Sequence, residues 1–234
     1  IKKTDVTRLV IERLRYLLEK EVIGPGSKLP TEYEMSKALG VSRPSLRQAY
    51  KALDILGIIR AAPGDGTYIN ESTSTILSTP LTFLMLMKKI RLDEVFEFRI
   101  LLEAELAALA ASSASDEEIE EMKIRLEAMK KCLSDKTREG YLKAEYEFHN
   151  LIARAAHQAL LFEIISMVSG VLWETRKRMV NLVVDLSEDL SEHRAIYRGI
   201  RSRDPMMAQR AMRKHLLTAI KLTRKNPFAE RMEA

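Results

Sequence analysis

The four histidines of the chain are the side chains best suited to bind a metal ion, and all of them lie within residues 149–215. Glu145 and His149 are four residues apart in a predicted helix, so they share one of its faces. His193 and His215 fall on two later predicted helices, and three helices of a bundle can bring such side chains to one centre. Three imidazoles and one carboxylate would suit zinc, nickel, manganese or another first-row divalent ion. Spacing alone also allows four separate histidines with no shared role.

Two arginines, Arg43 and Arg47, lie one turn apart near the start of a predicted helix. A helix fits the major groove of DNA, and the side chains of its first turns reach the base edges. Each guanidinium that contacts guanine with two hydrogen bonds would add about 1–3 kcal/mol of discrimination. Ser42, Ser45 and the helix N-terminus would suit a phosphate. Gln48 lies on the same outward face.

The segment 31–57 predicts two short helices joined by a tight turn, which is the helix-turn-helix outline. Thr31 and Glu34 form a capping box at the start of the first helix, and Gly40 supplies the left-handed residue that ends it. Ser42 can cap the second helix. That helix has an apolar stripe that must face the core: Leu46, Ala49, Tyr50 and Leu53.

Two short strands are predicted at 58–60 and 67–69, around a glycine-rich turn, and they complete a winged helix-turn-helix over residues 1–70. Residues 71–79 are polar and predict a linker. Residues 80–234 predict an antiparallel α-helical bundle that holds the effector, the metal and the dimer contacts, so the fold class is mainly α. Its expected helices are 80–90, 92–113, 116–134, 138–157, 160–184, 188–202 and 204–224.

The distribution of charge supports a nucleic-acid partner for the first domain. The chain has a net charge of +5, and residues 1–70 hold 12 Lys and Arg against 8 Asp and Glu. An excess of this kind is expected where one domain meets an anionic polymer. We expect a cytoplasmic protein without a membrane partner, because the sequence shows neither a signal peptide nor an apolar run of about 20 residues. One cysteine excludes a disulfide framework.

The N-terminal motifs resemble those of the GntR family of bacterial regulators. The resemblance lies in Gly-Pro-Gly-Ser-Lys-Leu-Pro-Thr-Glu (24–32), Leu-Gly-Val-Ser-Arg (39–43) and Gly-Asp-Gly-Thr-Tyr-Ile (64–69). It implies that Arg43, Ser45, Arg47 and the wing tip at Gly66 contact DNA, and we add Ser42, Gln48 and Thr31 as candidates. The chain departs from the family at Tyr33, where arginine is usual, at Asp65, where a basic or polar residue is common, and at Pro44, where the proline of the second helix lies one residue early.

The later motifs resemble the FadR-type C-terminal domain, called FCD. They are Phe-Glu-Phe-Arg (96–99) with Leu-Glu (102–103), Glu145 with Phe-His (148–149), Glu-His-Arg-Ala-Ile (192–196) and His-Leu (215–216). The resemblance implies a divalent metal, zinc first, on Glu145, His149, His193 and His215, with Glu145 in place of the usual aspartate. It also implies an effector-pocket role for Arg99, against which stands a simple ion pair with Glu103. His157 replaces a glycine and is expected to be structural.

These observations predict a ligand-responsive transcriptional regulator, a repressor by expectation, and not an enzyme. It would act as a homodimer on a palindromic double-stranded operator and respond to a small organic acid. One alternative is a metal-free regulator of the same fold that senses an acyl chain or acyl-CoA. A metal-dependent hydrolase is a weaker alternative, because no general base or nucleophile motif accompanies the metal ligands and a DNA-binding domain has no place in it.

Overall fold

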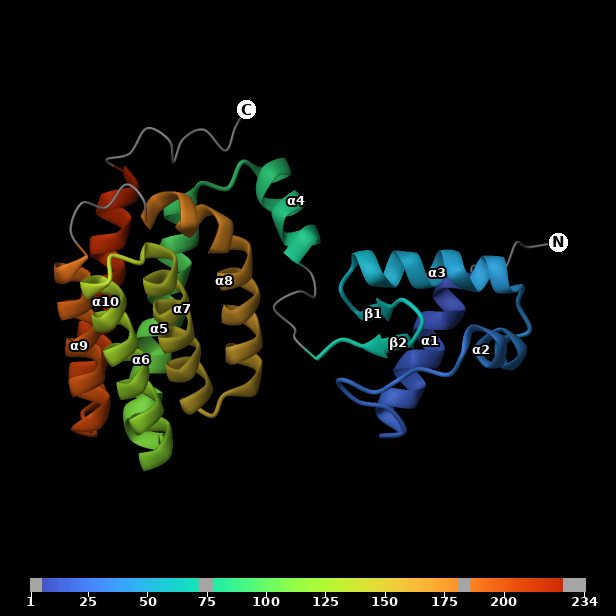
Figure 1. The fold of residues 1–234 in the computed structure, drawn as a ribbon, viewed down its shortest axis with the longest axis horizontal. Coiled ribbons are helices and arrows are strands. Elements are labelled where there is room, and N and C mark those ends of the chain that lie inside the picture. The colour runs from blue at the N-terminus through green and yellow to red at the C-terminus, as the bar shows by residue number, and fades with distance from the viewer. Residues whose placement is uncertain (1–5, 72–77, 181–185, 225–234) are drawn as a thin grey trace. The chain divides into compact units, whose positions relative to one another are not determined.

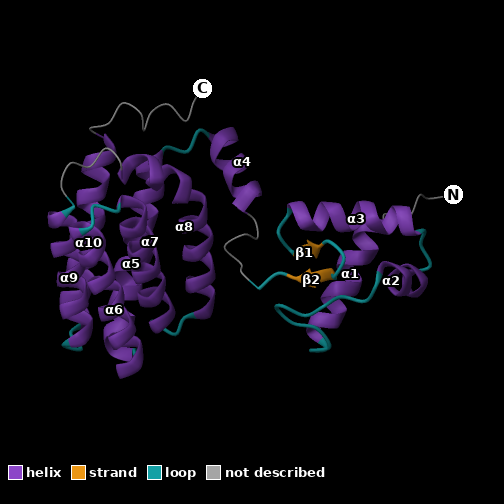
Figure 2. Ribbon diagram, in the orientation of Figure 1, coloured by secondary structure: helices purple, strands orange, loops and turns teal. Residues whose placement is uncertain are grey.

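The computed structural model describes residues 6–71, 78–180 and 186–224, and helices form most of them (Figure 2). The described residues contain ten helices and one two-stranded antiparallel sheet, which confirms the predicted mainly α fold. The chain divides into two units, Ile1–Thr82 and Phe83–Ala234. The predicted linker 71–79 falls largely on residues 72–77, which lie outside the described residues.

The first unit contains α1 (Val6–Glu19), α2 (Glu32–Leu39) and α3 (Arg43–Ile55). The predicted capping box is present, since Thr31 accepts from the Glu34 amide and the Glu34 carboxylate accepts from the Thr31 amide. Gly40 ends α2 with a φ of 64°, a left-handed value that glycine adopts without strain. Ser42 caps α3 as predicted. The turn between these two helices is therefore fixed by local sequence.

One apolar core holds this unit together, and the predicted stripe of α3 lies at its centre. Leu46, Ala49 and Leu53 are fully buried, and α3 packs on α1, α2 and β1. Because these residues face inward, the opposite face of α3 faces away from the core. The other members of the core come from α1, the loop before α2, α2 itself and the two strands: Val10, Leu14, Leu17, Ile23, Leu29, Met35, Ile59 and Ile69.

The wing consists of β1 (Ile59–Ala62) and β2 (Gly66–Ile69), paired so that Ile59 lies opposite Ile69. Lys28 forms an additional bridge to Tyr68, which joins the loop before α2 to the wing. Gly66 has a φ of 142°, and a Cβ there would lie 2.8 Å from the Lys28 Cε. Glycine at the wing tip thus leaves room for the Lys28 side chain in its present position.

The second unit is a helical bundle (Figure 1). Central helix α5 (Leu92–Ser113) packs against α7 (Arg138–Ala155), α8 (Ala159–Val180), α9 (Ser187–Arg201) and α10 (Pro205–Arg224). Helix α6 (Asp116–Ser134) packs on α7 and α9, and α4 (Ser78–Lys88) precedes the bundle in the chain. The predicted spans 92–113 and 116–134 coincide with α5 and α6. Helix α7 ends two residues before its predicted end, and residues 181–184 of the expected 160–184 helix lie outside the described residues.

Helices α9 and α10 approach each other closely at Gly199. A Cβ at this position would lie 2.5 Å from the backbone nitrogen of Ala208 and 2.7 Å from its Cα. Only glycine permits this contact, because the neighbouring atoms belong to backbone and cannot rotate away. The contact fixes the spacing of the two helices that carry His193 and His215.

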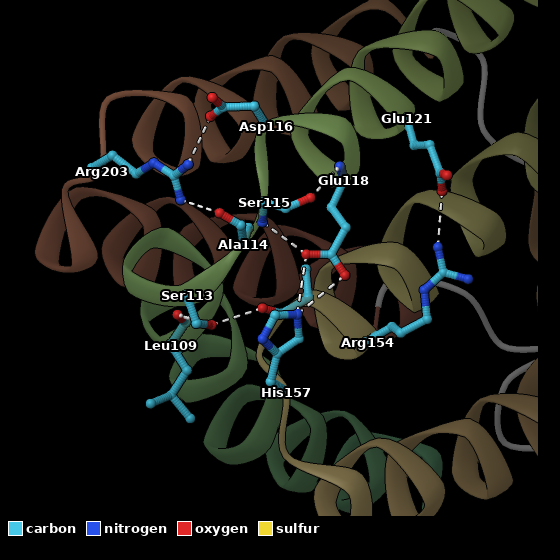
Figure 3. A network of polar contacts seen from close by, with 11 residues as sticks. Leu109, Ser113, Ala114, Ser115, Asp116, Glu118, Glu121, Arg154, His157 and Arg203 are labelled. Carbon is cyan, nitrogen blue, oxygen red and sulfur yellow. Dashed lines mark hydrogen bonds and ion pairs between the residues drawn. The ribbon is translucent and has the colours of Figure 1, made fainter.

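A polar network ties one end of the bundle together (Figure 3). Arg203, between α9 and α10, donates to the Ala114 carbonyl and to Asp116 at 2.9 Å. Glu118 accepts from the Ser115 amide at 2.9 Å and contacts the His157 ring at 3.1 Å, just beyond α7. The network therefore holds the ends of α5, α6, α7 and α9 in register.

Candidate metal centre and candidate nucleic-acid interface

Four buried side chains meet inside the bundle. Glu145 and His149 come from α7, His193 from α9 and His215 from α10. One ligand atom of each lies within 4.8 Å of the ligand atoms of the other three. The structure thus brings together the four residues that the sequence analysis singled out, from positions up to 70 residues apart.

The imidazoles of His149 and His193 present lone pairs to each other. The Nδ1 of His193 lies 2.8 Å from the Asp189 carbonyl oxygen, which can only accept, so Nδ1 carries the hydrogen. The Nδ1 of His149 lies 2.6 Å from a carboxylate oxygen of Glu103 and donates to it for the same reason. In the neutral rings, both Nε2 atoms then hold lone pairs, yet they are 3.2 Å apart. Such a contact requires a cation between or beside them, either a proton or a metal ion.

The spacing of the His149 and His193 nitrogens suits two ligands of one metal ion. Two imidazole nitrogens bound to one zinc at about 2.0–2.1 Å with a tetrahedral angle lie about 3.3 Å apart, close to the His149–His193 distance of 3.2 Å. The Nε2 of His215 is buried and has no hydrogen-bond partner among the described residues. A buried nitrogen of this kind costs free energy unless a ligand satisfies it. Three Nε2 atoms and the Glu145 carboxylate would together supply four donors, and an ion that takes more than four ligands would keep a position open.

A buried ion pair orients the His149 ring through its Nδ1 atom. Glu103 lies one turn after Arg99 on α5, and Arg99 Nε donates to it at 2.5 Å. Burial alone would raise the pKa of Glu103, but Arg99 and His149 outweigh it and hold that pKa far below its ordinary value. Burial lowers the pKa of His149 to about 4, so this imidazole is neutral at pH 7, as metal binding requires. Hydrogen bonds from ligating histidines to carboxylates are the usual outer support of metal sites.

Two further carboxylates support the other histidines. Asp189 lies 3.3 Å from His193 Nδ1 and accepts from the Tyr141 hydroxyl at 2.6 Å. Glu192 lies 3.3 Å from His215 Nδ1. Burial opposes ionisation of Asp189, but its histidine neighbours lower its pKa overall, and the Asp189 carboxylate in turn raises the pKa of His193 against the effect of burial. Each imidazole therefore has an acceptor fixing its Nδ1.

These supporting residues were missed by the sequence analysis, with the exception of Glu103. Asp189 could have been found, because it precedes His193 by four residues and so shares its face on α9. Tyr141 and Glu192 contact partners on other helices, and no spacing in the sequence reports those contacts. His157 is outside the centre: it follows α7 with a φ of 52° and contacts Glu118.

Arg43 and Arg47 lie on the face of α3 opposite the apolar core. Their side chains are 58% and 56% exposed, whereas Leu46 and Leu53 on the other face are fully buried. Gln48 is also exposed, and the hydroxyls of Ser42 and Ser45 lie 2.9 Å apart at the helix start. Within the first unit, the polar face of α3 is therefore exposed, as the sequence predicts.

The other candidate positions in this unit lie at α2 and in the wing. Thr31 caps α2, and Gly66 is exposed at the wing tip. Asp65, beside it, accepts from Lys28 Nζ at 2.9 Å and from the Tyr68 hydroxyl at 2.5 Å, and these two bonds lower the pKa of Asp65. Tyr33, where the family usually has arginine, is 62% exposed. The acidic residue of the wing therefore neutralises a lysine of the same unit.

A recognition-type helix with a wing, joined to a helical domain around a buried polar centre, defines a DNA-binding transcriptional regulator. Among the helices that the structure describes, none combines the length and apolar character needed to cross a membrane. The chain belongs to the GntR family, in the group that carries an FCD domain. Residues 7–69 match the model described as bacterial regulatory proteins, gntR family, and residues 94–218 match the FCD domain.

Known proteins resemble the chain over nearly its whole length. The HTH-type transcriptional regulator YcbG of Bacillus subtilis is 30% identical, covering 92% of this chain and 89% of that protein. The HTH-type transcriptional repressor NanR of Klebsiella aerogenes is 27% identical, covering 92% and 84%. A solved structure of Streptococcus agalactiae GntR superimposes with a TM-score of 0.70 at 25% identity, covering 92% and 99%. Both units thus occur together in these relatives.

Proposed function

We propose that the chain is a transcriptional repressor whose helical domain binds a divalent metal and, with it, a small carboxylate effector. One observation carries the proposal: three buried Nε2 atoms and a carboxylate converge in a chain whose other unit exposes two arginines on a recognition-type helix. The repressor assignment is supported by the resemblance to NanR. Effector binding would favour one arrangement of the DNA-binding units over another.

The metal proposal rests on Glu145, His149, His193 and His215, and zinc suits this set best, with nickel or manganese as alternatives. Elemental analysis of protein as purified should give about one equivalent of metal per chain. His193→Ala should lower it below about half an equivalent, and His157→Ala, the matched control, should leave it unchanged. Less than half an equivalent in the unaltered protein would instead favour the metal-free acyl-chain sensor.

The effector proposal rests on Arg99. Its guanidinium is fully buried and is linked to the ligand His149 through Glu103. A small carboxylate bound at an open metal position would meet a cation suited to pair with it. Thermal unfolding of the metal-loaded protein against a panel of small mono-, di- and hydroxycarboxylates tests this. A stabilising acid should act on unaltered protein and lose its effect in Arg99→Met, which keeps an unbranched side chain.

The DNA proposal assigns base or phosphate contacts to Arg43, Arg47, Ser42, Ser45, Gln48, Thr31 and Gly66. We propose a cytoplasmic homodimer on a palindromic operator, because helix-turn-helix dimers bind two matching half-sites. Exposed apolar side chains support self-association, and they lie on α4 and α5: Phe83, Leu84, Leu86, Met87, Phe98 and Leu101. Selection of bound duplexes from a random library, with light scattering for mass, tests both points. A monomer without sequence preference at moderate salt would contradict the proposal.

A further inference from the structure

One carboxylate engages both arginines of the recognition helix. Glu32, the first residue of α2, accepts from Arg47 Nε at 3.1 Å and from Arg47 Nη2 at 2.7 Å. Arg43 Nη2 lies 3.8 Å from the same carboxylate. The Glu32 side chain is 30% exposed, so this contact lies at the edge of the surface that α3 presents. Fifteen residues separate Glu32 from Arg47, and only the helix-turn-helix geometry brings them together.

Glu32 carries its negative charge at neutral pH. The hydrogen bond from Arg47 lowers the pKa of Glu32, and the charges of Arg47 and Arg43 add to this against the opposing effect of burial. An exposed ion pair of this kind contributes little to folding stability. Its larger effects are on where the guanidinium points and on how much positive charge the helix offers to phosphates.

We propose that Glu32 is a positioning residue that sets the sequence specificity of DNA binding, by holding Arg47 and by offsetting its charge. This inference rests on the proposed role of α3 in DNA binding. The carboxylate occupies the Nε–Nη2 edge of Arg47. This contact fixes the orientation of the guanidinium, so that its Nη1 side meets a base edge at a defined position. A guanidinium without this contact can turn to any nearby phosphate.

The same carboxylate suppresses binding to the wrong sequences. Phosphate contacts supply most non-specific affinity, and each contact that forms releases cations from the DNA and so steepens the salt dependence. Glu32 repels phosphates and competes with them for Arg47 and Arg43. It therefore weakens the sequence-independent part of binding while it preserves the geometry that reads bases. The ratio of specific to non-specific affinity increases through both effects.

Two substitutions separate these effects. Glu32→Gln removes the charge at nearly constant shape, and Glu32→Asp keeps the charge but shortens the reach to Arg47. The 234-residue protein is titrated onto a duplex selected from a random library and onto its scrambled version, over 0.05–0.2 M salt. In Glu32→Gln the slope of log K against log salt on scrambled DNA should steepen by about 0.9, the value for one more phosphate contact. Its specificity ratio should fall by about tenfold, the lower part of the range for one lost base contact.

Glu32→Asp should keep the unaltered slope and still lose specificity, which a purely electrostatic role would not produce. Glu12→Gln is the matched control, because Glu12 is an exposed carboxylate that pairs with an arginine of its own helix, Arg8 on α1. In an Arg47→Ala background, Glu32→Gln should change the ratio by clearly less than in the unaltered protein, since the positioned pair is absent and only the effect of the charge on Arg43 and on phosphates remains. Circular dichroism confirms that each variant is folded.

The outcomes separate the two proposals. If the unaltered protein selects no sequence, the proposed DNA-binding function fails. If it selects one, but both Glu32 variants behave as Glu12→Gln does, the role of Glu32 is wrong and the function stands. A reduced ratio that persists undiminished in the Arg47→Ala background would also overturn the role given to Glu32.

Discussion

Glu103 divides its carboxylate between Arg99 on its own helix, at 2.5 Å, and His149 on α7, at 2.6 Å. All three side chains are buried. The contact gives Glu103 two tasks, since it neutralises a buried guanidinium and fixes which nitrogen of His149 faces the centre. Changes at this residue should therefore affect stability and metal binding together.

Glu103→Gln should destabilise the protein by about 3–5 kcal/mol, because it leaves a buried guanidinium without its counter-charge. It should also weaken metal binding by about 10–100-fold, the usual effect of removing an outer hydrogen-bond partner. Denaturant unfolding and competition with a chromophoric chelator measure the two effects. Glu105→Gln, on the exposed side of α5, is the control. Equal behaviour of the two variants would contradict this account.

Removal of metal should lower the thermal stability of the helical unit. A ligand present at one hundred times its dissociation constant stabilises by about 2.7 kcal/mol, which corresponds to a rise in midpoint of about 5–10 °C for a chain of this size. Calorimetry with zinc or with chelator tests the expectation. His215→Ala should abolish the difference, and His157→Ala should retain it. A midpoint insensitive to chelator would argue against an ion at this centre.

Asp65→Asn should increase binding to non-specific DNA. The substitution removes the charge that holds Lys28, so the lysine becomes available to a phosphate beside the wing. One additional phosphate contact should steepen the salt dependence of binding by about 0.9 in logarithmic slope. Fluorescence anisotropy on a scrambled duplex measures it. Glu71→Gln, an exposed change just after the wing, serves for comparison. An unchanged slope would show that Lys28 does not reach DNA.

Gly199→Ala should destabilise the bundle by about 1–3 kcal/mol, because the added methyl group meets the backbone of α10. Separation of α9 from α10 should also move His193 away from His215 and weaken metal binding. Urea unfolding and chelator competition provide the measurements. Arg198→Ala, an exposed position on the same helix, should change neither quantity appreciably. Wild-type values for Gly199→Ala would show that the helices can separate without consequence.

The sequence predicted those parts of the fold that local chemistry determines. The Thr31–Glu34 capping box, the left-handed Gly40 and the Ser42 cap are all present, so the helix-turn-helix was predictable from a few adjacent residues. The predicted end of α7 was less accurate. The pattern continues to His157, but His157 itself adopts a left-handed conformation, which ends the helix earlier.

Contacts between helices were predictable only where a motif encoded them. The four candidate ligands were predicted from the resemblance to the FCD domain, because the spacing of Glu145 and His149 on one helix face left separate histidines as an alternative. The bond from Arg47 to Glu32 and the contact of His215 with Glu192 depend on packing angles and rotamers, which spacing does not report. For Arg99, spacing correctly gave the ion pair with Glu103. Its effector role stays a prediction.

The candidate ligands lie on three helices, and they span the chain from residue 145 to residue 215. A chain with one cysteine cannot form an intramolecular disulfide. An ion held at this centre would act as a reversible cross-link that closes a loop of that length. Closing such a loop removes conformational entropy from the unfolded chain and so stabilises the folded one. The availability of the metal would then control the stability of the bundle as well as the occupancy of the site.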